Sequence, residues 1–169
     1  MRRSISTLLG VTAAAGIVAL GVPALASPAA ASTASPDPRA ALTDSVDRWG
    51  PIFARNGLAS ARGVVRDNWF GVRRNTVTVS GQLTDRDFRT FRRGGKCAYV
   101  NFDLRRLGAP RFAFSDGPTY TWCGADKAPR SFSFTRNNIG AVRATVCQID
   151  RFGGRPLACR TQVIYDVRR

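Results

Sequence analysis

From Ile52 to its end, the chain alternates apolar and polar residues with a period close to two, and this alternation constrains the fold more than any other feature. The clearest examples are NTVTVSGQL at 75–83 and AYVNFDL at 98–104, where every second residue from Val77 or from Ala98 is apolar or glycine. A period of two is typical of β-strands with one buried face. Helical patterning is nearly absent after Trp49, which excludes a parallel βαβ architecture.

Six further short segments have strand-like patterns and are separated by turn signals: LASARGVV at 58–65, RFAF at 111–114, TYTW at 119–122, SFSF at 131–134, AVRATVCQI at 141–149 and TQVIYDV at 161–167. About eight short strands with frequent turns predict an all-β fold, an antiparallel β-sandwich that is immunoglobulin-like in the broad sense. The alternation predicts this inward-facing set: Val77, Val79, Leu83, Val100, Phe102, Phe112, Phe114, Phe132, Phe134, Val142, Val146 and either Val163 or Ile164.

The segment DPRAALTDSVDRW at 37–49 has a different pattern. Pro38 suits the first position of a helix, and Leu42, Val46 and Trp49 follow at helical intervals. A short helix is therefore expected here, ended by the Gly-Pro pair at 50–51.

The N-terminus has the three parts of a secretory signal peptide. Arg2 and Arg3 precede an apolar stretch at 8–22, and Ala24-Leu25-Ala26 offers a cleavage site, with a second one after Ala31. We expect a signal peptide at 1–26, a disordered leader at 27–37 that is rich in Pro, Ala, Ser and Thr, and one domain at 38–169. The mature protein is expected to be secreted and extracellular.

Four cysteines remain after the signal peptide: Cys97, Cys123, Cys147 and Cys159. In an exported chain they are expected to form two disulfides, for which three pairings exist in principle. The local sequence favours Cys97–Cys123 and Cys147–Cys159, because Gly153-Gly154 offers a tight turn between the latter two. Closing a loop of this size stabilises a fold by about 3 kcal/mol in the chain-entropy model.

The chain is strongly basic, with a formal charge of +15. Without Arg2 and Arg3 it keeps 24 basic side chains against 11 acidic ones. Such an excess predicts an anionic partner. The alternative is a coding bias toward arginine, since the chain has no glutamate, and its only lysines are Lys96 and Lys127.

The absence of histidine excludes several kinds of chemistry. Triads with Ser and His, Cys-His pairs and His-ligated metal sites cannot be built. A hydrolase would have to use aspartates alone, and Asp85, Asp87 and Asp103 are the candidates for such a site. Asp85 and Asp87 bracket Arg86 in an expected loop, where salt bridging and turn capping are the competing roles. We therefore predict no catalytic residues.

No cofactor or metal site is predicted either. The cysteines lack the paired short spacings of a zinc site, and no D-x-D-x-D-G calcium loop is present. The glycines do not form a phosphate-binding loop or a dinucleotide fingerprint.

The stretch DRDFRTFRRGGKC at 85–97 is the main candidate for binding. Its basic and aromatic residues are Arg86, Phe88, Arg89, Phe91, Arg92, Arg93 and Lys96. Arginines with aromatic side chains hold polyanions, and such a loop also suits an anionic membrane or wall polymer. In the alternative interpretation, Phe88 and Phe91 cover an open end of the sandwich while the arginines stay in water. The sequence leaves the orientation of the two rings open.

A second exposed candidate is the segment RFGGRPLAC at 151–159. A rigid loop closed by a disulfide could present Arg155 to a protease, because preorganisation lowers the entropy cost of binding. Pro156 would make the bond after Arg155 a poor one to cleave. A protease inhibitor is therefore a second alternative function.

The segments NTVTVSGQLTD, GKCAYVNFDL and VRATVC, with Cys159 a short gap after Cys147, resemble small secreted actinobacterial proteins that have a β-sandwich-like domain and no assigned function. The resemblance implies an exported β domain with two disulfides and transfers no catalytic residue. In such proteins a shorter turn rich in Asp and Gly is expected where this chain has its basic loop. The expected function is non-enzymatic binding of an anionic polymer, cell wall or membrane surface, with no specific nucleic acid.

Overall fold

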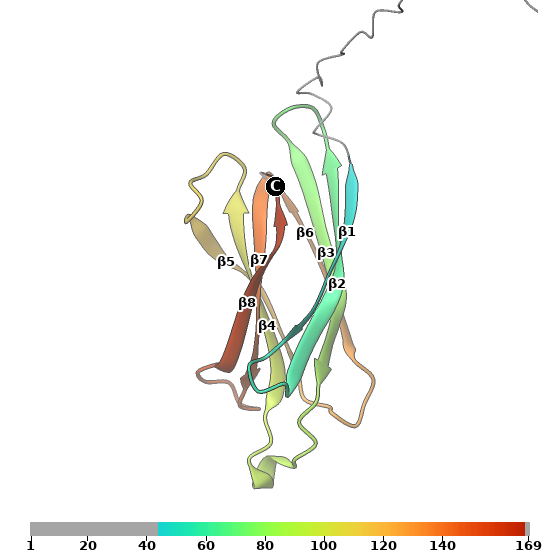
Figure 1. The fold of residues 1–169 in the computed structure, drawn as a ribbon, viewed down its shortest axis with the longest axis vertical. Helices are drawn as coiled ribbons and strands as arrows, with labels where there is room; N and C mark the ends of the chain where they lie inside the picture. Colours follow the sequence, from blue (N-terminus) through green and yellow to red (C-terminus); the bar gives the residue numbers. More distant parts are fainter. Residues whose placement is uncertain (1–43, 168–169) are drawn as a thin grey trace, which may run out of the picture. The chain divides into compact units, whose positions relative to one another are not determined.

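The computed structural model describes residues 44–167, so the predicted signal peptide, the leader and the first part of the predicted helix lie outside the described residues. The described chain forms eight strands and one short 3₁₀ helix (Figure 1). They are β1 (Ser45–Phe53), β2 (Ala59–Trp69), β3 (Asn75–Asp85), η1 (Phe91–Arg93), β4 (Cys97–Arg106), β5 (Phe114–Trp122), β6 (Arg130–Asn137), β7 (Ile139–Ile149) and β8 (Leu157–Asp166).

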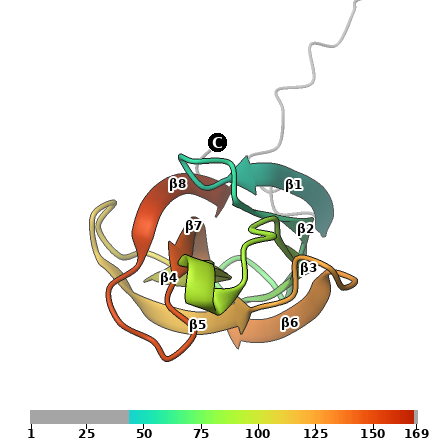
Figure 2. The ribbon, with the colours of Figure 1, turned by 90° about the horizontal axis from the view of Figure 1, so that it is seen from below.

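The strands form two antiparallel sheets that pack face to face (Figures 1 and 2). One sheet has the order β1-β2-β3-β6, and the other has the order β5-β4-β7-β8. The predicted antiparallel sandwich is therefore confirmed. The chain changes sheet between β3 and β4, between β5 and β6, and between β6 and β7. Within residues 44–167, the structure contains no helix that is long and apolar enough to cross a membrane.

Most of the predicted inward-facing residues form the core between the sheets. Val77, Val79, Leu83, Val100, Phe102, Phe132, Phe134, Val142, Val146 and Ile164 are all buried. At the end of the chain, Ile164 rather than Val163 belongs to the buried cluster. Alternation predicts these positions because successive side chains of a strand point to opposite faces of the sheet.

The prediction was wrong for Phe112 and Phe114. Phe112 precedes β5 and is 88% exposed. Phe114 pairs with Arg105 on β4. Because Arg105 follows inward-facing Leu104, Phe114 lies on the outer face of the sheet. There, the Arg143 guanidinium is 4.4 Å from the Phe114 ring centroid. The segments 111–114 and 119–122 are not two strands, because β5 runs from Phe114 through Pro118. Since β5 is an edge strand, it tolerates proline.

The predicted helix at 38–49 was also wrong where the structure describes it, because residues from Ser45 onward form strand β1. β1 pairs with β2, and its register shifts between Trp49 and Ile52. This irregularity interrupts the two-residue alternation, and both Trp49 and Ile52 are buried although they are three residues apart. The helical interval from Val46 to Trp49 does not mark a shared face, because Trp49 is buried and Val46 is exposed.

Both predicted disulfides, Cys97–Cys123 and Cys147–Cys159, are formed. Cys97 begins β4 and Cys123 follows β5, while Cys147 and Cys159 lie on β7 and β8. Each bridge thus joins neighbouring strands of the same sheet, at the end where loop 86–96 lies. The structure describes no free cysteine in residues 44–167.

A row of four residues crosses the first sheet from edge to edge: Trp49, Gly63, Gly81 and Phe132 are successive cross-strand partners. A Cβ on Gly81 would lie 2.8 Å from Cζ of Phe132, so the Phe132 ring occupies the space that a side chain would take. The Trp49 and Phe132 ring centroids are 6.2 Å apart. The two glycines therefore allow two large rings from the sheet edges to pack close together in the core.

A buried polar cluster that the sequence pattern did not predict links the two sheets. The Tyr165 hydroxyl on β8 donates a hydrogen bond to Asp67 Oδ2 on β2. Asn75 Nδ2 donates to the Tyr165 hydroxyl at 3.0 Å, and Ile139 N donates to Asn75 Oδ1 at 2.9 Å. Asp67 Oδ1 has no hydrogen-bond partner among the described residues. Burial raises the pKa of Asp67 above its ordinary value of 3.8.

We expect the change Asp67→Asn to become more favourable relative to wild type as the pH rises. A carboxyl whose pKa is raised by folding stabilises the fold below its unfolded pKa, and this contribution is lost as the pH rises through the folded pKa. The asparagine does not titrate. Urea unfolding of both proteins from pH 3.5 to pH 8 measures the difference in free energy of unfolding, which should shift in favour of the variant. A difference in the free energy of unfolding that stays constant with pH would contradict a raised pKa of Asp67 in the folded protein.

Candidate polyanion-binding surface

The predicted basic-aromatic segment is the loop at 86–96 between β3 and β4. Because these strands belong to different sheets, the loop is not a hairpin but a crossing over one end of the sandwich. It projects as the lowest part of the molecule in Figure 1 and crosses the end of the sandwich in Figure 2. Its tip is η1, which is followed by Gly94 with φ +77°.

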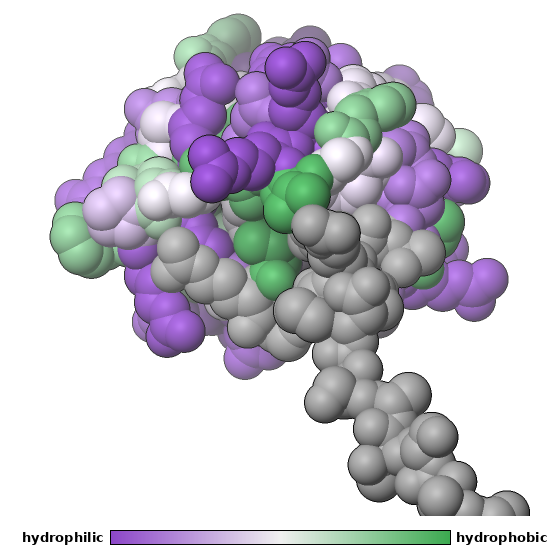
Figure 3. All heavy atoms as spheres, turned by 90° about the horizontal axis from the view of Figure 1, so that it is seen from above, coloured by the Kyte–Doolittle hydropathy of each residue, from purple (hydrophilic) through white to green (hydrophobic). Residues whose placement is uncertain are grey.

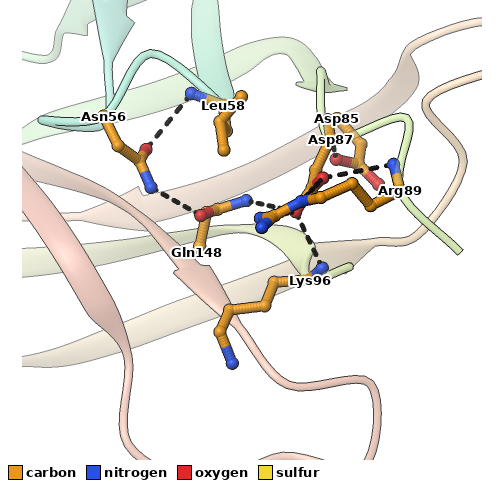
Figure 4. A network of polar contacts seen from close by, with 7 residues as sticks. All are labelled: Asn56, Leu58, Asp85, Asp87, Arg89, Lys96 and Gln148. Atoms are coloured by element: carbon orange, nitrogen blue, oxygen red, sulfur yellow. Dashed lines mark hydrogen bonds and ion pairs between the residues drawn. The ribbon is translucent and has the colours of Figure 1, made fainter. Parts of the chain in front are cut away.

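The carboxylate of Asp87 holds this loop in place, and its side chain is 1% exposed (Figure 4). Oδ1 accepts a hydrogen bond from Arg89 Nε at 2.8 Å, and Oδ2 accepts from Arg89 Nη2 at 2.8 Å. Oδ2 also accepts from Lys96 N at 3.0 Å and from Gln148 Nε2 at 3.1 Å. The Arg89 guanidinium and these donors hold the pKa of Asp87 well below its usual range. Asp87 therefore connects both ends of the loop to β7.

The same network reaches the turn between β1 and β2 (Figure 4). Asn56 Nδ2 donates to Gln148 Oε1 at 2.6 Å, and Leu58 N donates to Asn56 Oδ1 at 3.2 Å. Gln148 is thus held from both sides and is itself buried. Because Asp87 and Gln148 are 61 residues apart in the chain, no local sequence pattern could have predicted their contact.

Asp85 secures the start of the loop. Its Oδ1 accepts a hydrogen bond from Asp87 N at 3.0 Å, which is an Asx turn, and its Oδ2 accepts from Gly124 N at 3.0 Å. Burial raises the pKa of Asp85 above its ordinary value. Both aspartates therefore serve to shape the loop, which is the turn-capping role considered from the sequence.

The aromatic side chains of the loop point outward. Phe88 is 78% exposed and Phe91 is 47% exposed. Neither belongs to the buried cluster between the sheets. Of the two interpretations that the sequence left open, the structure supports an exposed surface and not a lid over the core.

The basic residues of the loop divide into two groups. Arg89 pairs with Asp87, Lys96 Nζ pairs with Asp150 Oδ1, and the Arg86 guanidinium lies 5.3 Å from the Phe53 ring centroid. Arg92 and Arg93 on η1 are exposed and form no ion pair within the described part of the chain. The first group positions the loop, and the second is available to a ligand.

The β7–β8 loop at 150–156 lies beside this loop and extends its surface. Phe152 is 83% exposed, and its ring centroid is 5.3 Å from that of Phe91 in an edge-to-face contact. Arg151 and Arg155 are exposed as well. The sequence singled out this segment only as an inhibitor loop, and no local signal indicated that it would join the basic loop. We call the exposed residues Phe88, Phe91, Arg92, Arg93, Arg151, Phe152 and Arg155 the basic-aromatic surface.

The three aspartates of the hydrolase alternative do not come together. Asp85 and Asp87 line a hollow of about 340 Å³ together with the exposed Asp126. Asp103 does not line it and instead accepts a hydrogen bond from Arg143 Nε at 2.9 Å on the sheet of β4 and β7. Among residues 44–167, no group of three side chains is arranged to hold a metal ion.

No protein-family model, curated protein sequence or solved structure matches this chain. The residues and their geometry therefore carry the functional argument.

Proposed function

We propose that this chain is exported and acts outside the cell as a non-enzymatic domain that binds a surface or polymer rich in phosphate or sulfate groups. The observation that carries the proposal is the outward orientation of Phe88 and Phe91 beside unpaired arginines, on a loop that Asp87 anchors from within. The two disulfides fit an oxidising compartment outside the cell.

The charge at this end supports an anionic ligand. The loops at 86–96 and 150–156 hold seven basic side chains and two acidic ones, Asp87 and Asp150. Both acidic residues already form ion pairs, with Arg89 and Lys96. The remaining positive charge is not neutralised by the described chain, and it attracts anions over roughly 10 Å at 0.1 M salt.

Anchoring of the loop also favours binding. A ligand that meets a preorganised surface does not have to order it, which lowers the entropy cost of association. The exposed arginines Arg62 and Arg66 lie on the outer face of the first sheet, and no strand within residues 44–167 carries an exposed aromatic side chain. Exposed rings also occur at the opposite end, where Phe70 and Phe112 lie in loops that contain arginines. The end with loop 86–96 differs because Phe91 contacts a ring from a second loop and because Asp87 anchors the loop.

The double substitution Arg92→Ala/Arg93→Ala should weaken binding to heparin and to soluble polyphosphate. Each lost phosphate contact reduces the slope of log K against log salt by about 0.7–0.9, because fewer counterions are released. Retention and titration over a salt series measure this slope. Arg89 is left intact, because its loss would also release Asp87.

The matched control is Arg73→Ala/Arg74→Ala, which removes the same charge from the β2–β3 loop. That loop is at the other end of β3 and hence on the opposite end of the sandwich, where hydrophilic and hydrophobic side chains are mixed (Figure 3). In this control, the slope of log K against log salt should change much less than in Arg92→Ala/Arg93→Ala. Equal losses of affinity and of salt slope in both variants would indicate a response to net charge alone and would contradict a site at loop 86–96. A wild-type protein that binds neither polymer nor any anionic surface would contradict the proposed function itself.

A further inference from the structure

Three phenylalanines are exposed at the end of the sandwich that carries the basic-aromatic surface. Phe88 and Phe152 are 78% and 83% exposed, and Phe91, at 47%, packs edge to face against Phe152. The contact joins the β3–β4 and β7–β8 loops, so the rings belong to one surface and not to two separate loops. Exposed apolar rings in such a cluster mark an interaction site.

The shape of this surface favours a broad ligand over a threaded chain. Proteins that bind single-stranded nucleic acids usually hold the strand in a positively charged groove. Here η1 projects from the end of the molecule (Figure 1), and the hollow beside it is lined by Asp85, Asp87 and Asp126. Arg89 also lines the hollow and pairs with Asp87, so the exposed carboxylate there is that of Asp126. This carboxylate repels a polyanionic strand, whereas the projecting tip can meet a flat surface.

The arginines adjoin the rings in the sequence. Arg92 and Arg93 follow Phe91 directly, and Arg151 precedes Phe152. Arginine and phenylalanine together suit a bilayer interface, because the guanidinium pairs with anionic headgroups while the ring enters the acyl boundary. A soluble polyanion would use the charges but would give the rings no apolar environment.

We infer that the basic-aromatic surface docks onto a lipid bilayer with anionic headgroups, and that Phe88 and Phe152 enter the boundary between headgroups and acyl chains. This inference rests on the proposed function and names its ligand. The arginines supply electrostatic attraction to the headgroups. The rings add apolar contacts with the acyl chains, for which a soluble polymer offers no environment.

The test is co-sedimentation of the full mature protein with vesicles of phosphatidylglycerol and phosphatidylcholine, compared with vesicles of phosphatidylcholine alone. Wild type should bind the anionic vesicles, and Phe88→Ala/Phe152→Ala should bind them about a hundredfold less, since each lost ring costs about tenfold. Its affinity for soluble polyphosphate should fall much less, because Arg92 and Arg93, which pair with phosphate, are unchanged. Phe112→Ala, which removes an exposed ring at the opposite end, should behave as wild type.

A second measurement detects insertion directly. In Phe152→Trp, the new indole should be quenched by lipids brominated on the acyl chains, beyond the quenching in wild type, whereas Phe112→Trp should show no added quenching. Binding of polyphosphate without binding of vesicles would overturn this inference and leave the proposed function standing. Vesicle binding that survives the double phenylalanine change, or that is lost in Phe112→Ala, would also overturn it. Absence of binding to both ligands would remove the proposed function as well.

Discussion

Replacing Gly63 with alanine should destabilise the protein by about 3 kcal/mol or more, at the upper end of what overpacking costs. A Cβ at this position would lie 2.0 Å from the carbonyl oxygen of Ser80 and 2.8 Å from Cα of Gly81. Both atoms belong to the backbone of β3, which pairs with β2 residue by residue from end to end. The clash therefore cannot be relieved by turning a side chain and must move the two strands apart.

Gly57→Ala is the control, since it makes the same chemical change where the space around the glycine is open. Gly57 has φ +73°, so alanine there costs only the strain of a left-handed backbone, about 1–2 kcal/mol. Urea unfolding measures the free energy of unfolding of both variants. Hydrogen exchange should show faster opening of β2 and β3 in Gly63→Ala than in Gly57→Ala. A Gly63→Ala protein as stable as Gly57→Ala would mean that the sheet can bend away from the added methyl group.

The sequence predicts the sandwich well where strands alternate regularly. On β3 and β4, every second side chain meets the opposite sheet, so Val79 and Phe102 could be placed in the core from spacing alone. The pattern fails where the backbone is irregular. In β1, Val46 and Trp49 have a helical spacing, but only Trp49 faces the core, and the register shift after it breaks the alternation. Phe112 lies outside any strand.

The candidate site could be located from the sequence but not completed. The composition of 86–96 indicates a binding loop, yet the direction of Phe88 depends on how Asp87 is held. That anchor requires Gln148 on β7, and the neighbouring ring, Phe152, comes from a loop about 60 residues away. Contacts of this kind follow from the topology that brings β3–β4 and β7–β8 to the same end, and only the three-dimensional structure shows them.

Substitution of Asp87 with alanine should lower the free energy of unfolding by about 3 kcal/mol, because each buried donor left without an acceptor costs about 1–3 kcal/mol. The orphaned donors are Gln148 Nε2 and Lys96 N, and Arg89 loses its partner as well. Loop 86–96 would then be free to move, and trypsin should cut after its arginines faster than in wild type. Asp126→Ala, which changes an exposed carboxylate of the same hollow, should change neither stability nor cleavage.

The pH dependence of the same variant separates the charge of Asp87 from its shape. Folding lowers the pKa of Asp87 below its ordinary value of 3.8, so its stabilising contribution is present above that value and is lost as the pH falls toward the folded pKa. The stability gap between wild type and Asp87→Ala should therefore narrow below about pH 4 and stay constant from pH 5 to pH 8. A gap that is independent of pH would show that Asp87 fills space without acting as an ionised acceptor. In that case another contact would have to anchor loop 86–96, on which the proposed binding of polyanions and of lipid both depend.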